Sequence, residues 1–303
     1  MLQMGMSRIG IQGYDRPMTA SSPLQDNSHA PLPHAPDQGQ MPERLKTVVL
    51  TGASGGIGLL IAKRLLAQNY HVIALCRSKP ALETPSLTHI PCDLGLPDAV
   101  TQACALITQE NKTVFAVIHC AGTIAPAPVA QADDKAIAAQ IMLNLSSPIV
   151  LTRHLLPQMI SAGEGRIVFV NSMAAVIPLS GSAVYAAAKS GLRNFALSLA
   201  QEVTKQGIHV SSVFPGAVQT EMLAREMQEG GSILNYVSTP LDPDLVAKTI
   251  VSQLAHPRAE RFLPAVDGLF GRFCMMNPAL LRLALPLLAY LGRRGYRKAT
   301  GAR

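Results

Sequence analysis

A tyrosine and a lysine stand four residues apart, at Tyr185 and Lys189, near the start of a helix predicted over Ala183–Gln206. At this spacing the two side chains share one face of a helix. A free tyrosine has a pKa of about 10, and a neighbouring ammonium group stabilises the phenolate. The pair is therefore suited to moving a proton to or from a substrate oxygen.

A serine stands 13 residues before this tyrosine, directly after an apolar stretch that predicts a strand. The strand covers Arg166–Val170, and Ser172 follows it at the strand's carboxyl end. A hydroxyl at this place can donate a hydrogen bond to a carbonyl oxygen and stabilise charge that develops on it. Together with Tyr185 and Lys189, the serine indicates chemistry at a carbonyl or an alcohol.

A glycine-rich turn opens the ordered part of the chain, between a strand predicted at Thr47–Leu50 and a helix predicted at Leu59–Gln68. Glycines permit a tight turn, and the unpaired N–H groups at the following helix N-terminus attract an anion. The turn is predicted to hold the pyrophosphate of a dinucleotide. Its candidate binding residues are Gly52, Ser54, Gly55, Gly56, Ile57 and Gly58.

The spacing Thr-Gly-x-x-x-Gly-x-Gly, combined with the serine and the Tyr-x-x-x-Lys pair, resembles the short-chain dehydrogenase/reductase family over about residues 46–266. The resemblance implies a nicotinamide dinucleotide bound across the carboxyl ends of the strands. It also implies a catalytic set in which Asn144, between Leu143 and Leu145, joins the three residues above. In the family, this asparagine holds a water that links the lysine to solvent.

The resemblance extends to other strand ends. Asp93 and Leu94 match residues beside the adenine, and the Ala121-Gly122 pair matches the backbone that passes the cofactor. His119 and Cys120 stand where the family commonly has two asparagines, and we interpret them as packed side chains. The positions that the resemblance assigns to the cofactor are Asp93, Leu94, Ala121, Gly122, Tyr185, Lys189, Pro215, Gly216, Val218 and Thr220.

The end of the second predicted strand, His71–Leu75, selects between the two nicotinamide cofactors. An acidic residue there would bind a ribose 2′-hydroxyl and repel a 2′-phosphate. The chain instead has Arg77 and Ser78, and a guanidinium group suits a phosphate by charge and by geometry. The sequence therefore favours NADP over NAD as the cofactor.

The predicted strands alternate with longer helical segments, among them Ala132–Ile160. Further strands are predicted at Leu87–Pro91, Val114–His119, His209–Phe214 and Arg261–Val266. Such alternation is typical of βαβ units. We predict a Rossmann-like, doubly wound α/β fold with a parallel sheet of about seven strands and helices on both faces. The predicted catalytic domain covers residues 44–267, with about residues 221–240 covering the substrate.

The two ends of the chain differ from this domain. The first 42 residues hold six prolines and no helical period, so residues 1–43 are predicted to form a disordered arm. Residues 1–257 carry 17 basic and 17 acidic side chains, whereas residues 258–303 carry nine and two. The net charge of +7 therefore lies in the last 46 residues, which include the predicted extension 268–303.

The extension holds an apolar run at 279–291, which Arg282 and Pro286 interrupt, and then a cationic cluster at 292–298. A membrane-spanning helix needs about 20 apolar residues, so this run is predicted not to span. Apolar residues followed by cations are typical of an interfacial anchor on an anionic membrane. The alternative is a helix that packs on the body or completes a dimer interface, and the sequence leaves both open.

The leading hypothesis is an NADP-dependent oxidoreductase that interconverts a carbonyl and a secondary alcohol, on a lipophilic or a smaller soluble substrate. The alternatives are a 3-oxoacyl reductase for carrier-bound substrates and a non-catalytic NADP-binding sensor or scaffold. The five cysteines form no Cys-x-x-Cys pair, which indicates a reducing, cytoplasmic setting without a zinc site. Because the body is neutral, nucleic-acid binding is not expected. The family resemblance implies a homo-oligomer.

Overall fold

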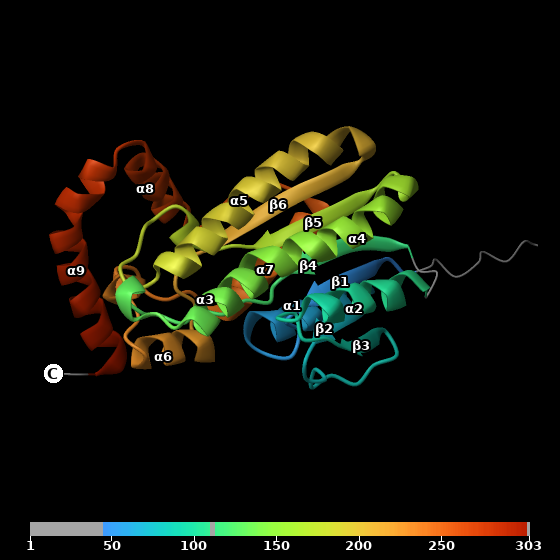
Figure 1. Cartoon of the computed structure of the whole chain (residues 1–303), viewed down its shortest axis with the longest axis horizontal. Coiled ribbons are helices and arrows are strands. Elements are labelled where there is room, and N and C mark those ends of the chain that lie inside the picture. The colour runs from blue at the N-terminus through green and yellow to red at the C-terminus, as the bar shows by residue number, and fades with distance from the viewer. Residues whose placement is uncertain (1–44, 110–112, 302–303) are drawn as a thin grey trace, which may run out of the picture. The chain divides into compact units, whose positions relative to one another are not determined.

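The computed structural model describes residues 45–109 and 113–301 (Figure 1). The predicted arm at 1–43 lies outside the described residues. The strands are β1 (Thr47–Thr51), β2 (His71–Cys76), β3 (Leu87–Pro91), β4 (Val114–His119), β5 (Gly165–Val170), β6 (Ile208–Pro215) and β7 (Glu260–Leu263). They form one seven-stranded sheet in the order β3-β2-β1-β4-β5-β6-β7, and every neighbouring pair is parallel. The predicted fold is confirmed.

Helices cover both faces of this sheet. On one face, α2 (Pro97–Gln109), α4 (Ser147–Ala162) and α5 (Ala183–Val203) bury an apolar cluster against the strands. On the other face, α1 (Gly56–Ala67) and α7 (Pro243–Ala255) bury a second cluster. Side chains alternate between the faces along β1, so Val49 packs in the first cluster while Val48 and Leu50 pack in the second. Because both faces are covered, β1 is buried throughout.

The predicted helix at Ala132–Ile160 is present as one helical stretch with a change of pitch. It comprises α3 (Asp134–Ile141), a π-helical turn (Met142–Ser146) and α4, and Asp133 caps its N-terminus by accepting from the Ala136 N–H. Within the described residues, the stretch Asp134–Ala162 is the helix that is long and apolar enough to cross a membrane by length and composition. Its α4 part packs in the core against the sheet, which accounts for its apolar composition.

Among the predicted boundaries that differ from the structure, two have a clear local cause. Helix α1 begins at Gly56, earlier than predicted, because the glycine turn itself supplies its first residues. The predicted strand Arg261–Val266 is wrong at its end: β7 stops at Leu263, and Ala265 and Val266 belong to α8. Pro264 separates the two elements because proline cannot donate to the ladder and suits the start of a helix.

Helical segments that follow β6 in the chain lie at the carboxyl end of the sheet. They include α6 (Glu221–Gln228) and the short 3₁₀ helix η5 (Ile233–Tyr236), and they end with α8 (Ala265–Met276) and α9 (Pro278–Thr300). Figure 1 shows α8 and α9 in red, beyond the ends to which the strand arrows point. Helix α8 spans the boundary predicted between residues 267 and 268.

Helix α9 lies directly on the backbone of η5. A Cβ atom at Gly292 would lie 2.5 Å from the Ile233 carbonyl oxygen, and one at Gly295 would lie 2.1 Å from the Tyr236 carbonyl oxygen. The rings of Tyr236 and Tyr296 meet edge to face, with centroids 5.1 Å apart. Only glycine permits this approach, so the cationic cluster at 292–298 also contains a packing surface.

Candidate active site

The side chains of Ser172 and Tyr185 meet at the carboxyl end of β5. Ser172 follows the strand and caps the 3₁₀ helix η3 (Met173–Ala175) by accepting from the Ala174 N–H at 3.1 Å. The phenol of half-buried Tyr185, in the first turn of α5, lies close enough to the Ser172 hydroxyl for this hydroxyl to offset part of the rise in the pKa of the phenol. A proton donor and a second hydroxyl thus face the same place.

Lys189 lies one turn along α5, and its side chain is 4% exposed. Its Nζ donates to the Val170 carbonyl oxygen at 2.9 Å and lies 5.7 Å from the centroid of the Tyr185 ring. Burial lowers the pKa of Lys189 to about 8, and it raises the pKa of Tyr185 to about 12. At neutral pH, the phenol therefore keeps its proton, while the lysine is charged close to its titration point.

Asn144 lies in the π-helical turn between α3 and α4 and is fully buried. Its Nδ2 donates to the carbonyl oxygens of Thr123 (2.7 Å) and Gln140 (2.9 Å), and its Oδ1 accepts from the Thr123 N–H. Both of its side-chain donors are thus used within the protein. A Cβ atom at Gly122 would lie 2.9 Å from Asn144 Oδ1 and 3.8 Å from Lys189 Nζ. The structure therefore brings Asn144, Lys189 and Gly122 together.

The glycine turn forms a cradle that larger residues would fill. Gly52 has a φ of 72°, and a Cβ atom on it would lie 2.9 Å from the Ala121 Cα. A Cβ atom on Gly58 would lie 2.0 Å from the Gly52 carbonyl oxygen. Thr51 Oγ1 accepts from the N–H groups of Cys120 and Ala121, which ties β1 to the residues after β4.

The N-terminus of α1 opens at this cradle. Gly55 precedes the helix in an extended conformation, and neither a side-chain cap nor an acidic residue stands in the first turn. Ser54, Gly55 and Gly56 are exposed, whereas Ile57 packs partly against the core. Such an end presents N–H donors and a positive dipole to an anion. The arrangement fits a pyrophosphate group.

Exposed polar residues follow β2 and β3 beside this cradle. Arg77, Ser78 and Lys79 are exposed in succession, and the Cys76 thiol donates to the Ser78 carbonyl oxygen at 3.2 Å. Lys79 is a second cation that the sequence reasoning did not include, although its place two residues after Arg77 was a usable signal. The chain therefore presents two cations and no carboxylate directly after β2.

The two residues predicted beside the adenine differ in exposure. Asp93 is exposed, and its Oδ1 accepts from the Gly95 N–H. Leu94 packs in the core, and its carbonyl oxygen accepts from the Ser147 hydroxyl. Only the Asp93 side chain is therefore accessible to a ligand.

The predicted nicotinamide segment leads from β6 into α6. Pro215 ends β6, the Gly216 N–H donates to the Leu263 carbonyl oxygen at 2.7 Å, and Val218 bridges to Leu241. Thr220 then caps α6 by accepting from the Leu223 N–H. These contacts hold the segment at the carboxyl end of the sheet, where the candidate catalytic residues also lie.

His119 and Cys120 are packed side chains. The His119 ring is 3% exposed, lies 2.9 Å from Thr152 Oγ1 and stacks on Phe169 at 4.8 Å between centroids. Burial lowers its pKa to about 3, so the ring is neutral at physiological pH. Burial also raises the pKa of Cys120 to about 12, which keeps the thiol protonated.

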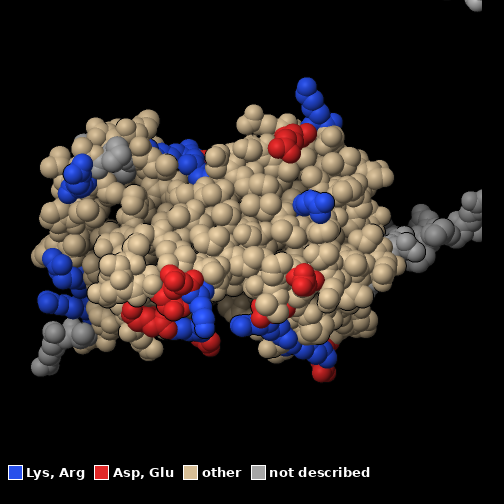
Figure 2. Space-filling model, viewed as in Figure 1, with Lys and Arg blue, Asp and Glu red and all other residues tan. Residues whose placement is uncertain are grey.

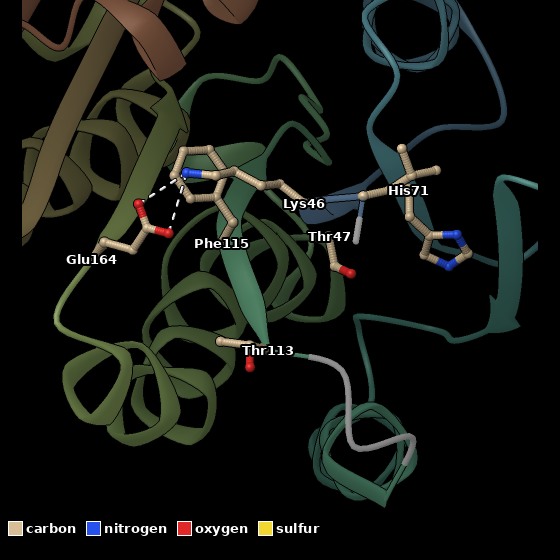
Figure 3. Close-up of a pocket in the computed structure, with 7 residues that line it drawn as sticks. Lys46, Thr47, His71, Thr113, Phe115 and Glu164 are labelled. Atoms are coloured by element: carbon tan, nitrogen blue, oxygen red, sulfur yellow. Dashed lines mark hydrogen bonds and ion pairs between the residues drawn. The ribbon is translucent and has the colours of Figure 1, made fainter. Parts of the chain in front are cut away.

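A cavity of about 350 Å³ lies at the amino ends of the strands, at the end of the sheet opposite to the candidate catalytic residues (Figure 3). Lys46 crosses it, pairs with Glu164 at 2.9 Å and lies 4.2 Å above the centroid of the Phe115 ring. Both charged side chains are about half exposed and already satisfy each other. We assign no chemistry to this cavity, because the candidate catalytic residues stand at the other ends of the strands.

Comparisons with known proteins agree with this geometry. A family model described as short chain dehydrogenase matches residues 46–230. The chain is 33% identical over 179 residues to the uncharacterized oxidoreductase YbbO of Escherichia coli, covering 58% of this chain and 66% of that protein, slightly under two thirds of its length. It is 30% identical over 237 residues to the 3-oxoacyl-[acyl-carrier-protein] reductase MabA of Mycobacterium avium, covering 77% and 88%.

Solved structures share the fold. A short-chain dehydrogenase from Streptomyces avermitilis superposes with a TM-score of 0.68 at 25% identity, covering 81% of this chain and 97% of that one. A 4-hydroxyisoleucine dehydrogenase complexed with NADH gives a TM-score of 0.65 at 25% identity, covering 72% and 96%. A metagenomic short-chain oxidoreductase in complex with NADP gives 0.58 at 26% identity, covering 69% and 90%.

Proposed function

The chain belongs to the short-chain dehydrogenase/reductase family, and we propose that it is an NADP-dependent oxidoreductase that interconverts a carbonyl and a secondary alcohol. The observation that carries the proposal is the cluster of Ser172, Tyr185, Lys189 and Asn144 beside the glycine cradle. A non-catalytic sensor would need no proton donor, so the cluster argues against that alternative.

The protein's part in the reaction is to orient the carbonyl and supply a proton. When bound, NADPH supplies a hydride to the carbonyl carbon. The Ser172 hydroxyl and the Tyr185 phenol both reach the carbonyl oxygen, and the phenol gives its proton to the alkoxide that forms. Lys189 stabilises the resulting phenolate. The Asn144 side chain holds the Thr123 segment beside Lys189. We also propose that a water held at Asn144 links Lys189 to solvent as a proton relay.

Oxidation of NADPH with a panel of aldehydes, ketones and long-chain 3-oxo compounds tests this function. We expect turnover with at least one class of carbonyl, and loss of that turnover in Tyr185→Phe with cofactor binding retained. Cofactor binding without turnover of any carbonyl would instead favour the sensor.

The preference for NADP is proposed from Arg77, which is exposed where no carboxylate follows β2. A guanidinium can pair with a 2′-phosphate, and an aspartate in its place would repel it. We expect Arg77→Asp to lower kcat/KM for NADPH far more than for NADH. Lys63→Asp, an equal charge change on exposed α1 surface, is the control. Equal losses for the two cofactors would show that Arg77 does not bind the 2′-phosphate.

We further propose that α8 and α9 hold the protein against an anionic membrane and admit a lipophilic substrate. The outer surface of these helices, called the C-terminal apolar face below, exposes large apolar side chains. They are Val266, Leu269, Phe273, Met275, Met276, Leu283, Leu287, Tyr290 and Leu291. Figure 2 shows basic residues at the end of the molecule where α9 lies. Exposed apolar side chains beside cations suit a membrane interface.

Helix α9 both packs on η5 and presents this face outward, so the experiment must separate the two roles. We expect the intact protein to float with anionic liposomes at low salt, and a variant lacking residues 278–303 to remain in the soluble fraction. Leu283→Asp with Leu287→Asp keeps the η5 contact and should also abolish flotation. An intact protein that stays soluble with these liposomes would contradict the membrane proposal.

The second candidate function is reduction of carrier-bound 3-oxoacyl substrates. It is favoured by the similarity to MabA and by the cations of α9, which could attract an acidic carrier protein. Turnover that depends on the carrier rather than on the free ketone would support it over the lipid-surface proposal.

A further inference from the structure

A carboxylate at the start of the last strand joins helix α5 to helix α8. Glu260 is the first residue of β7, and its side chain is 12% exposed. Arg193 donates to both of its oxygens, from Nε to Oε1 at 2.5 Å and from Nη2 to Oε2 at 3.2 Å, and Arg272 Nη2 donates to Oε2 at 2.9 Å. Such a forked, charge-assisted contact fixes geometry as well as charge. These three residues are called the ion triad below.

The two arginines of the ion triad come from different helices. Arg193 lies in α5, one turn after Lys189, so the two side chains share one face of that helix. Arg272 lies in α8, and its Cζ atom lies 4.6 Å from the centroid of the Phe262 ring. Glu260 therefore ties α8 to the helix that carries the proposed proton donor.

Helix α8 packs on the residues that follow Ser172. A Cβ atom at Gly271 would lie 2.9 Å from Val176 Cγ2 and 3.0 Å from Ile177 Cγ1, so the backbone of α8 lies directly on these side chains. Gly271 directly precedes Arg272 in the chain. The ion triad therefore holds α8 at the point where this helix meets the stretch after the serine.

The Phe262 ring contacts both α8 and β6. A Cβ atom at Gly268 would lie 2.3 Å from Phe262 Cγ, and the Phe262 ring stacks on Phe214 with centroids 4.4 Å apart. The two rings belong to one buried cluster, whose members are Met173, Ala175, Val176, Phe214 and Phe262. Three of these residues follow Ser172 within four positions, so α8, β7 and the stretch after the serine pack as one unit.

The stretch after Ser172 also contacts α5 directly, because the Ser190 hydroxyl donates to the Ala175 carbonyl oxygen at 3.2 Å. This neutral hydrogen bond holds one point of the stretch, whereas the ion triad adds a charge-assisted connection through α8. Two points of contact restrict a rotation that one point permits. A displacement of about 1 Å at a reacting group can cost about 10²-fold in rate, so loss of the second connection should lower activity.

We propose that Glu260 is a positioning residue for Ser172. Through Arg272 it holds α8 on the residues after the serine, and through Arg193 it fixes α8 relative to α5. This inference rests on the proposed function, in which Ser172 and Tyr185 both reach the carbonyl oxygen. The two hydroxyls come from different elements, so their separation depends on how η3 lies against α5.

Reduction of a carbonyl from the panel above measures this role. We expect Glu260→Gln to lower kcat/KM about tenfold or more, because it leaves Arg193 without a charged partner and frees α8. Arg272→Met removes the contact to α8 but keeps the Arg193 pair, and it should lower kcat/KM about threefold or more. Glu164→Gln, which breaks the ion pair with Lys46 at the amino ends of the strands, is the matched control and should change kcat/KM less than twofold. A Glu260→Gln protein that loses no more activity than this control would overturn the proposal.

A double-mutant cycle with Ser172→Ala separates positioning of the serine from a general loss of structure. If Glu260 acts through the serine hydroxyl, Glu260→Gln should lower kcat/KM less than about twofold in the Ser172→Ala background, against about tenfold in the wild type. A weakened fold would lower activity whether or not the hydroxyl is present. An equal fall in both backgrounds would therefore overturn the proposal.

Hydrogen exchange in the NADP⁺-loaded protein provides a readout that does not need turnover. The N–H groups of Ala175, Val176 and Ile177 form hydrogen bonds in and directly after η3. We expect Glu260→Gln to speed their exchange about tenfold or more, while exchange in the buried strand β1 stays unchanged. Unchanged exchange at these three groups would overturn the proposal. Faster exchange there, in a protein whose wild type reduces no carbonyl, would instead contradict the proposed function alone.

Discussion

Replacing Lys189 with methionine is expected to stabilise the fold while abolishing activity, because the lysine is charged in a buried place. Burial lowers its pKa from 10.5 to about 8. At about 1.4 kcal/mol per pKa unit, this fall corresponds to about 3 kcal/mol of unfavourable free energy at neutral pH. The variant also loses the hydrogen bond that the charged lysine donates to the Val170 carbonyl oxygen, worth about 2 kcal/mol. The net gain at pH 6.5 is therefore about 1 kcal/mol.

The sign of the pH dependence follows from the same pKa. Between about pH 8 and 10.5 the unfolded chain holds a proton on Lys189 that the folded chain has lost, so wild-type stability rises with pH across this window. The stability of Lys189→Met relative to the wild type should therefore fall by about 2 kcal/mol between pH 6.5 and pH 9.5. Groups that titrate alike in both proteins cancel in this comparison.

Urea unfolding of both cofactor-free proteins at the two pH values measures this change. Lys189→Arg serves as a control, because it keeps a charge that does not titrate in this range. A stability difference between wild type and Lys189→Met that is equal at both pH values would refute the assignment of a buried lysine with a lowered pKa.

Three further substitutions have defined outcomes. Tyr185→Phe should lower the reduction rate by about 10² to 10⁴ while NADPH fluorescence titration shows unchanged binding; undiminished turnover would exclude Tyr185 as the proton donor. Gly58→Ala would place a Cβ 2.0 Å from the Gly52 carbonyl oxygen, so we expect a loss of stability of about 1–3 kcal/mol and weaker NADPH binding, whereas Gly55→Ala, whose Cβ meets open space, should leave the stability of the cofactor-free protein unchanged. Gly295→Ala would place a Cβ 2.1 Å from the Tyr236 carbonyl oxygen and should raise the KM for the carbonyl substrate while leaving NADPH affinity unchanged. Ala299→Ser on the exposed side of α9 should alter neither quantity, and equal KM values for the two variants would show that the contact of α9 with η5 does not shape the substrate site.

Most of the sheet could be predicted from the sequence because its strands are short apolar runs buried on both faces. Leu87–Pro91 and Val114–His119 form strands over the predicted residues. Boundaries were less predictable where a residue changed the local geometry. Before Pro264, β7 ends at Leu263, three residues before the end of the predicted strand, and the glycine turn brings the start of α1 forward to Gly56.

The candidate catalytic residues Ser172, Tyr185 and Lys189 could be picked out from the sequence because they lie in local patterns at a strand end and near a helix start, whereas Asn144, in the π-helical turn between α3 and α4, came from the family resemblance. The contacts of His119 and Cys120, which stand where the family commonly has two asparagines, could not be predicted, because their partners lie far away in the chain. Thr51 and Thr152 supply the hydroxyls that hold the Cys120 N–H and the His119 ring, respectively. Thr51 opens the glycine motif, but the motif itself does not indicate a contact of its hydroxyl with the residues after β4, and Thr152 belongs to none of the motifs above.

Glu226 of α6 shows the same limit more sharply: its carboxylate is buried and accepts from Asn235 Nδ2, and a single acidic residue in a polar helix gives no signal of this in the sequence. Its environment exists only after Asn235 and Gly231 fold against α6 and α9 closes on η5. The same helix α9 carries the C-terminal apolar face, so the proposed membrane contact and the position of the carboxylate depend on one element.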